Sequence, residues 1–123
     1  MDLDEPASPS TIAQRVKTAL GVNAVKLAAI SDEPITRVAA CPGAGGGMID
    51  GAITQGAQLF ITGEMRHHET LASMEKGCAV LLAGHTNTER PYLPTLAERL
   101  REHLEDAEFA ISERDRAPFV NLV

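Results

Sequence analysis

His85 and Glu89 are the two residues of this chain whose types and spacing most directly suggest chemistry. They stand four positions apart, so on a helix both side chains would project from one face. An imidazole and a carboxylate presented together can hold one divalent metal ion. Such pairs are also common on solvated helices, where they bind nothing. Thr86 and Glu89 could instead form a capping box at a helix start. The spacing therefore leaves both a metal site and a structural role open.

Two adjacent histidines, His67 and His68, form the second candidate group. Neighbouring residues on a helix point about a quarter-turn apart, so both reach one cleft only where the turn is irregular. One histidine could equally face solvent while the other caps a helix. However, His68 and His85 each belong to a polar segment that follows a predicted strand. This shared placement favours a metal-binding or acid–base role above what either residue alone would suggest.

A glycine-rich loop, residues 43–47, lies between a predicted strand and a predicted short helix. Glycines there let the backbone turn tightly and bring its N–H groups close to an anion. The loop matches neither a P-loop nor the GxGxxG pattern, because no Lys-Ser or Lys-Thr follows and the third glycine position holds Met48 or Asp50. A tight turn that binds nothing is an equal alternative. Cys41, just before the loop, is expected to be a buried and inert thiol.

The elements that must position these residues alternate between strand and helix patterns. Ser8 and Pro9 are typical of a helix start, and Gly21 of its end. The strand patterns cover residues 25–30, 35–41, 58–62, 78–83 and 108–111; the later helix patterns cover residues 48–55 and 67–76 and an apolar stripe at Leu93, Leu96, Ala97, Leu100 and Leu104. This alternation predicts an α/β fold with a mixed, mostly parallel sheet flanked by helices. Residues 1–7 are predicted to form a flexible leader, and residues 8–123 a single domain.

Three polar segments come directly after the ends of predicted strands. They are the glycine loop, residues 63–68 and residues 84–89. In parallel sheets, ligands bind in the crevice beyond the carboxyl ends of the strands. The sequence therefore predicts that these three segments converge in space.

Composition excludes several classes of function. The chain has 123 residues, with 11 Lys and Arg against 17 Asp and Glu, and a net charge of −6. A basic nucleic-acid grip and a cationic membrane face are therefore not expected, and aromatic residues for stacking make up only 3%. A mean hydropathy of −0.06 without a long apolar run argues against a membrane span. The acidic start differs from a signal peptide. Two cysteines outside any CxxC motif fit a reducing compartment, so a cytoplasmic location is expected.

Three segments together resemble one known family. Residues 37–46 (RVAACPGAGG) resemble its strand and glycine loop, residues 60–69 (FITGEMRHHE) its ITGD-x-K-Y-H segment, and residues 83–91 (AGHTNTERP) its GH-x-x-(S/T)-E segment. The tail from residue 112 to residue 119 is also similar. The family is the Nif-three-like dinuclear-metal-centre family, whose members are often labelled GTP cyclohydrolase type II homologues. The three motifs occur in the family's order and with similar spacing.

The resemblance implies an α/β fold, assembly into homo-oligomeric hexameric rings, and a site for two divalent metal ions between two similar domains. At the matching positions, it implies that His85 and Glu89 are metal ligands and that His68 lies in the same pocket. His68 would there act as a catalytic residue that positions water or a phosphate. Two positions depart from the usual pattern, because His67 stands in place of Tyr and Glu64 in place of Asp.

A larger departure concerns the remaining ligands. In the family a first domain supplies them from a His-His-Pro segment and an Asp, whereas His67 and His68 are succeeded here by Glu69. The chain therefore resembles only the second, C-terminal half of a family member. Two protein ligands cannot hold two metal ions in a shaped site, so another segment or a partner chain would have to supply the rest.

The residues and the resemblance leave three hypotheses about function. The first is a metal-dependent hydrolase domain with an incomplete ligand set, acting on a substrate such as a nucleotide. The second is a non-catalytic half-domain retained for assembly or interaction, with weak or no metal binding. The third is a module that binds an anion or nucleotide through the glycine loop. The first requires a second segment that carries His and Asp ligands, and the other two do not.

Overall fold

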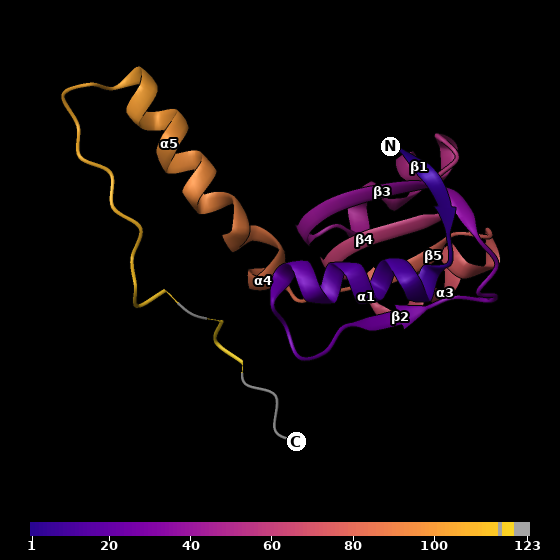
Figure 1. Cartoon of the computed structure of the whole chain (residues 1–123). Helices are drawn as coiled ribbons and strands as arrows, with labels where there is room; N and C mark the ends of the chain where they lie inside the picture. Colours follow the sequence, from indigo (N-terminus) through magenta and orange to yellow (C-terminus); the bar gives the residue numbers. More distant parts are fainter. Residues whose placement is uncertain (116, 120–123) are drawn as a thin grey trace.

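Five strands form one sheet in the order β1-β3-β4-β5-β2. They appear in the computed structural model of the chain, which describes residues 1–115 and 117–119 (Figure 1). Strands β3, β4 and β5 run parallel to one another, while β1 pairs with β3 and β2 with β5 in antiparallel fashion. The strands are β1 (Asp2–Ala7), β2 (Lys26–Ala28), β3 (Ile35–Ala44), β4 (Leu59–Glu64) and β5 (Ala79–Leu82). The sheet is therefore mixed, with a parallel centre.

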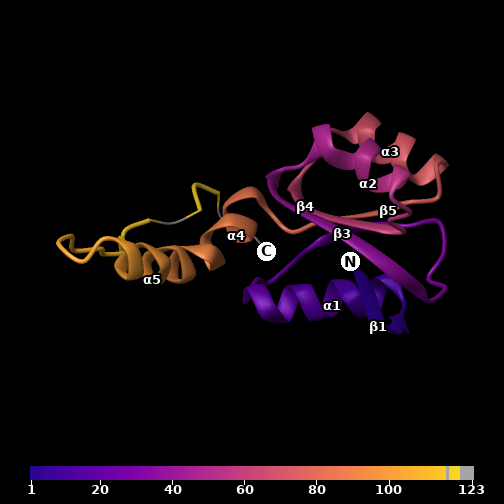
Figure 2. The ribbon, with the colours of Figure 1, turned by 90° about the horizontal axis from the view of Figure 1, so that it is seen from above.

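Helices cover both faces of this sheet. Helix α1 lies against one face, and α2 and α3 lie against the other (Figure 2). The helices are α1 (Pro9–Leu20), α2 (Ile49–Thr54), α3 (His67–Glu75), α4 (His85–Glu89) and α5 (Leu93–His103), with short 3-10 helices η1 (Gly46–Met48) and η2 (Arg90–Tyr92). This arrangement confirms the α/β fold predicted from the sequence.

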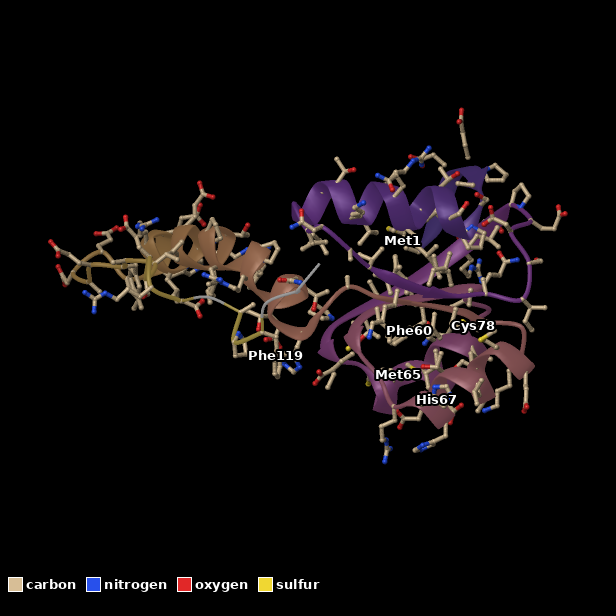
Figure 3. All side chains as sticks on the ribbon, turned by 90° about the horizontal axis from the view of Figure 1, so that it is seen from below. Met1, Phe60, Met65, His67, Cys78 and Phe119 are labelled. Carbon is tan, nitrogen blue, oxygen red and sulfur yellow. The ribbon has the colours of Figure 1, made fainter. Side chains whose placement is uncertain are left out.

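Two apolar clusters hold the layers together. Because successive strand residues point to opposite faces, Leu59 of β4 packs towards α1 with Ile12 and Leu81. Its neighbour Phe60 packs on the other face with Ile49 and Cys78. Figure 3 shows Phe60 and Cys78 between the sheet and the helices α2 and α3. The central strands are thus buried on both sides, which is typical of strands with continuous apolar sequences in parallel sheets.

The predicted ends of α1 are confirmed at both termini. The Ser8 hydroxyl accepts a hydrogen bond from the Thr11 N–H at 3.2 Å, and Pro9 occupies the first turn. Gly21 ends the helix in the left-handed conformation, with φ of 63°. The capping residues predicted from the sequence therefore form the caps themselves.

The prediction that residues 1–7 form a flexible leader is wrong. Residues 1–7 contain strand β1, which pairs with β3. The Arg37 guanidinium also binds the Asp2 carboxylate at 2.6 Å, and the Met1 amino group donates to the Val38 carbonyl at 3.0 Å. An acidic segment that contains a proline has a weak strand signal of its own. The segment becomes an ordered strand because it pairs with the otherwise free edge of β3.

The predicted strand at residues 108–111 is also wrong, because these residues form no strand. β1 and β2 already occupy the two edges of the sheet. The segment instead runs back alongside α5, where Arg101 donates to the Phe109 carbonyl at 2.6 Å (Figure 1).

Helix α5 forms where its apolar stripe predicted, but it projects away from the α/β body (Figures 1 and 2). Of its residues only Ala97 is buried, while Leu96 keeps 38% of its surface exposed. Helical periodicity thus predicted the element without predicting what would cover it. Among the described residues, none of the helices is both long enough and apolar enough to span a bilayer.

We predict that Leu81→Ala lowers the free energy of unfolding by about 2–5 kcal/mol, because it opens a cavity at a fully buried site. Leu71→Ala, at an exposed position of α3, is the control and should change it by less than about 1 kcal/mol. Urea unfolding followed by circular dichroism measures both. Equal losses in the two variants would contradict the placement of the core.

Candidate functional site

The three polar segments meet at the carboxyl ends of β3, β4 and β5. The Gly43 N–H donates to Thr88 Oγ1 at 2.9 Å, which joins the glycine loop to α4. The Gly84 N–H donates to the Gly63 carbonyl at 2.9 Å, which joins the segment after β5 to the end of β4. The convergence predicted from the sequence is therefore confirmed.

The glycine loop is shaped by an irregularity in β3. Cys41 pairs with Thr62, but Ala44 pairs with Glu64, so β3 carries one residue more than β4 between these pairs. An extra residue of this kind bends a strand and changes the direction of the backbone after it. Here the redirected backbone carries Gly43 towards α4.

Thr62 fixes this bent backbone from inside the core. Its side chain is fully buried. Its hydroxyl donates to the Gly43 carbonyl at 3.1 Å and accepts from the Gly45 N–H at 3.0 Å. A buried hydroxyl must find such partners, since leaving it unpaired is costly. The hydroxyl therefore ties the loop conformation to the packing of β4.

Helix α4 presents His85 and Glu89 from one short helical turn, as their spacing predicted. Thr88 docks this helix, because its Oγ1 accepts from Gly43 and lies 2.8 Å from the His85 carbonyl to which it can donate. The helix begins at His85 after Gly84. Thr86 is thus inside the helix, and the alternative capping box of Thr86 and Glu89 does not form.

His85 lies between two carboxylates. Its Nδ1 is 2.8 Å from Glu64 Oε1, and its Nε2 is 3.3 Å from Glu89 Oε1. The side chains of His85, Glu64 and Glu89 keep about half of their surface exposed, at 44%, 61% and 54%. The hydrogen bond to Glu64 raises the pKa of His85 above its usual value, and the negative charge of Glu89 adds to this effect.

Two glycines make this approach possible. A Cβ on Gly43 would lie 2.5 Å from Glu89 Oε1 and 3.2 Å from His85 Nε2. A Cβ on Gly63 would lie 2.7 Å from the Gly43 carbonyl oxygen and equally close to His85 Cα. Gly43 also has a positive φ of 69°, which favours glycine. These glycines therefore leave the space that the imidazole and the carboxylate occupy.

The donor set fits part of a divalent metal site. One imidazole nitrogen and one carboxylate oxygen converge beside Gly43, and both atom types are ordinary ligands of divalent ions. In the part of the chain that the structure describes, no group of three or more His, Cys, Asp or Glu side chains is arranged to hold a metal ion. The described residues thus offer this pair alone as candidate ligands, and its role as a metal site stays a prediction.

The two neighbouring histidines lie apart from this pair. His67 and His68 begin α3, both are exposed, and His67 points outward from the helix (Figure 3). Within residues 1–115 and 117–119, the hydrogen bonds and ion pairs of His85 and Glu89 do not involve His68. The structure does not bring His68 into direct contact with the pair, and its catalytic role stays a prediction.

The surroundings of the glycine loop do not favour an anion. A cavity of about 430 Å³ beside it is lined by Gly46, Gly47, Glu64, Arg66 and Glu69, among others. The Arg66 guanidinium is paired with the Glu69 carboxylate. An anion placed there would meet two carboxylates, so the geometry supports a tight turn over an anion site.

Cys41 is only partly buried, contrary to the expectation of a buried thiol. It lines a separate, largely apolar cavity of about 440 Å³ beside β1. The fully buried thiol is instead Cys78, whose pKa is raised by desolvation. Cys41 is the last residue of β3 before the irregular stretch, which the strand pattern in the sequence did not reveal.

Sequence reasoning missed the residues that arrange the pair, namely Thr62, Gly63, Glu64 and Thr88. In the sequence, Glu64 stands out only as a departure from the Asp of the family motif, and the glycines suggest only turns. Thr88 lies in the same family motif as His85, and the other three residues lie in the motif at residues 60–69, so membership of these motifs was the available signal.

The fold and the site define a class of protein: an α/β protein with a histidine–glutamate pair at the carboxyl edge of its parallel strands. The family model DUF34/NIF3, described as NGG1p interacting factor 3, matches residues 1–118. This chain belongs to the DUF34/NIF3 family.

Individual relatives agree with this assignment. NIF3-like protein 1 of Rattus norvegicus is 40% identical over 94% of this chain and 31% of its own length. A protein of Clostridium perfringens named GTP cyclohydrolase 1 type 2 homolog is 32% identical over 97% of this chain and 46% of its own length. The structure of Staphylococcus aureus protein SA1388 shares the fold, with a TM-score of 0.82 at 24% identity over 98% of this chain and 41% of that one. The chain thus spans between 31% and 46% of the length of these proteins.

We predict that Gly43→Ala destabilises the fold by about 1–3 kcal/mol, because the residue must keep a positive φ and its Cβ would displace Glu89. Gly47→Ala in the same loop is the matched control: a Cβ there meets nothing within 4 Å. Its effect should stay within about 1 kcal/mol. Chemical denaturation measures the stability of both variants, and the NMR signals of His85 should shift only in Gly43→Ala. An unchanged His85 signal in that variant would contradict the contact.

We predict that His85 titrates above its usual pKa of 6.5 in the folded chain, because two carboxylates stabilise the imidazolium. Its contribution to stability is then present below pH 6.5 and fades as the pH rises through the folded value. NMR titration of the imidazole Cε1–H, assigned with His85→Gln, measures this. Glu64→Gln should move the midpoint down, whereas a midpoint at or below 6.5 in the unaltered chain would disprove the arrangement.

Proposed function

We propose that this chain is a metal-binding part of a dinuclear-metal hydrolase site. His85 and Glu89 bind a divalent ion, and another segment or chain supplies the remaining ligands. The observation that carries this proposal is the convergence of His85 Nε2 and Glu89 Oε1, 3.3 Å apart, over the space left by Gly43. Thr88 docks the single helical turn that carries both groups, so both face the same side of the glycine loop.

Membership of the DUF34/NIF3 family supports the proposal. A relative covered to 46% of its length is named GTP cyclohydrolase 1 type 2 homolog, which points to hydrolysis of a nucleotide as a candidate reaction. Since the chain matches less than half of that relative, the rest of such a protein is where the missing ligands would lie. We place the chain at the second half of a family member, on the strength of its GH-x-x-(S/T)-E motif.

The chemistry of such a site divides between ion and protein. A bound divalent ion supplies positive charge that polarises a substrate oxygen. His85 contributes a neutral nitrogen donor and Glu89 a negative oxygen donor, and Gly43 keeps the space beside them open. His68 would position water or a phosphate group from the start of α3. The half-exposed pair leaves the ion accessible to a substrate from the solvent side.

Metal content tests the proposal. The chain is equilibrated with Zn²⁺ or Mn²⁺, dialysed, and measured by elemental mass spectrometry beside His85→Ala, Glu89→Gln and the control His103→Ala at the far end of α5. The unaltered chain and the control should retain metal. The two site variants should lose it, by more than the roughly 10–100-fold in affinity that an outer-shell change costs. No bound metal in any of the four proteins would refute the proposal for this chain.

A non-catalytic assembly role is the second candidate, and one observation favours it. Helix α5 projects away from the α/β body (Figure 1), and Leu96 within it and Leu104 directly after it are exposed. A homo-oligomeric ring, or a partner chain, would cover that helix. Sedimentation analysis tests this role: a discrete oligomer that forms without metal supports it, and a monomer at all concentrations speaks against it.

A further inference from the structure

The proposed function assigns the metal ion to His85 and Glu89, and not to Glu64. Glu64 nevertheless makes a shorter contact to the His85 ring than Glu89 does. It is the last residue of β4, and its Oε1 lies 2.8 Å from His85 Nδ1. The neighbouring Arg66 guanidinium does not pair with Glu64, because it binds Glu69 instead. Glu64 therefore faces the histidine and not a surface ion pair.

The two nitrogens of His85 differ in how they meet their carboxylates. The 2.8 Å contact to Glu64 has the length of a hydrogen bond to a charged acceptor. The 3.3 Å separation between Nε2 and Glu89 Oε1 is longer than an ordinary N–H···O hydrogen bond. Two donors on one tetrahedral ion, each about 2.0–2.1 Å from it, are themselves about 3.3–3.4 Å apart. Nδ1 thus makes the shorter contact to a carboxylate, and the distance on the Nε2 side is compatible with two donors on one ion.

We infer that Glu64 is a positioning residue: it holds the Nδ1–H of His85 so that Nε2 faces the metal ion together with Glu89. This inference rests on the proposed function. A histidine that binds a metal through one nitrogen commonly donates from the other to a carboxylate, which fixes the ring orientation and makes the free nitrogen a better donor. Here the carboxylate comes from a different element than the ligands.

The origin of Glu64 explains why it can hold the ring. Its backbone pairs with Ala44 at the end of a strand whose Leu59 and Phe60 are buried in the core. His85 begins a short helix, and its side chain is 44% exposed. Without a fixed partner such a side chain would sample several rotamers. The rigid strand therefore orients a ligand that the short helix alone leaves free to turn.

Three substitutions at one position test this. Glu64→Ala removes the acceptor, Glu64→Gln keeps an oxygen acceptor without its charge, and Glu64→Asp keeps the charge on a shorter arm. Glu75→Ala, at the other end of α3, is the matched control. Zn²⁺ affinity is measured for the full chain by competition with a chromophoric chelator. The protonated nitrogen of His85 is identified from two-bond ¹H–¹⁵N correlations in the metal-loaded protein.

We expect Glu64→Ala to weaken Zn²⁺ binding by about 10–100-fold without changing its stoichiometry. Glu64→Gln and Glu64→Asp should recover part of the affinity, and the control should bind as the unaltered chain does. The NMR spectra should show Nδ1 protonated and Nε2 bound to metal. Circular dichroism confirms that the variants fold, and the isosteric Glu64→Gln decides the test if Glu64→Ala does not.

The unfavourable outcomes separate the two proposals. Zn²⁺ bound through Nδ1, or a reduced stoichiometry in Glu64→Gln, would make Glu64 a ligand and overturn the inference alone. Unchanged affinity in all Glu64 variants would do the same. Failure of the unaltered chain to bind Zn²⁺ would overturn the proposed function, and the role of Glu64 in it would fall as well.

Discussion

The close approach of three backbone segments is the constraint on which the site depends. The glycine loop, the end of β4 and the start of α4 touch at Gly43 and Gly63, where a Cβ would lie within 2.5–2.7 Å of its neighbours. Hydrogen bonds from Gly43 to Thr88 and from Gly84 to Gly63 hold the segments at that distance. Because side chains would force these segments apart, the imidazole and the carboxylate can converge only where both glycines are kept.

The same approach couples the site to the core. Thr62 is buried in β4 between strands that pack on both faces, and its hydroxyl satisfies two backbone groups of the glycine loop. A fully satisfied buried hydroxyl rigidifies its surroundings. The loop conformation is therefore set by the packing of β4 as well as by the glycines of the loop itself. Parallel strands that end together then place β4 and β5 so that Glu64 and α4 face each other.

The edge of the sheet around His85 is rich in negative charge. Glu64 and Glu89 flank His85, and Glu69 lies nearby, while Arg66 is bound by Glu69. Carboxylates so placed draw cations, and the net charge of −6 adds to that tendency. The imidazolium balances part of this negative charge, since Glu64 raises the pKa of His85. A divalent ion bound as proposed would therefore compete with a proton for the same histidine.

The sequence by itself determined the succession of the central strands and helices along the chain and the capping of α1, because periodicity and caps are local signals. It also indicated the edge of the sheet at which the polar segments meet. It also singled out His85 and Glu89 from spacing and motif. Tertiary structure alone decided that residues 1–7 form β1, since their order comes from pairing with β3 and not from their own propensity. It likewise left residues 108–111 without a strand partner, and it placed the Glu64 carboxylate within hydrogen-bond distance of the His85 ring. Contacts between segments far apart in the chain carry no local pattern, so only the folded chain shows them.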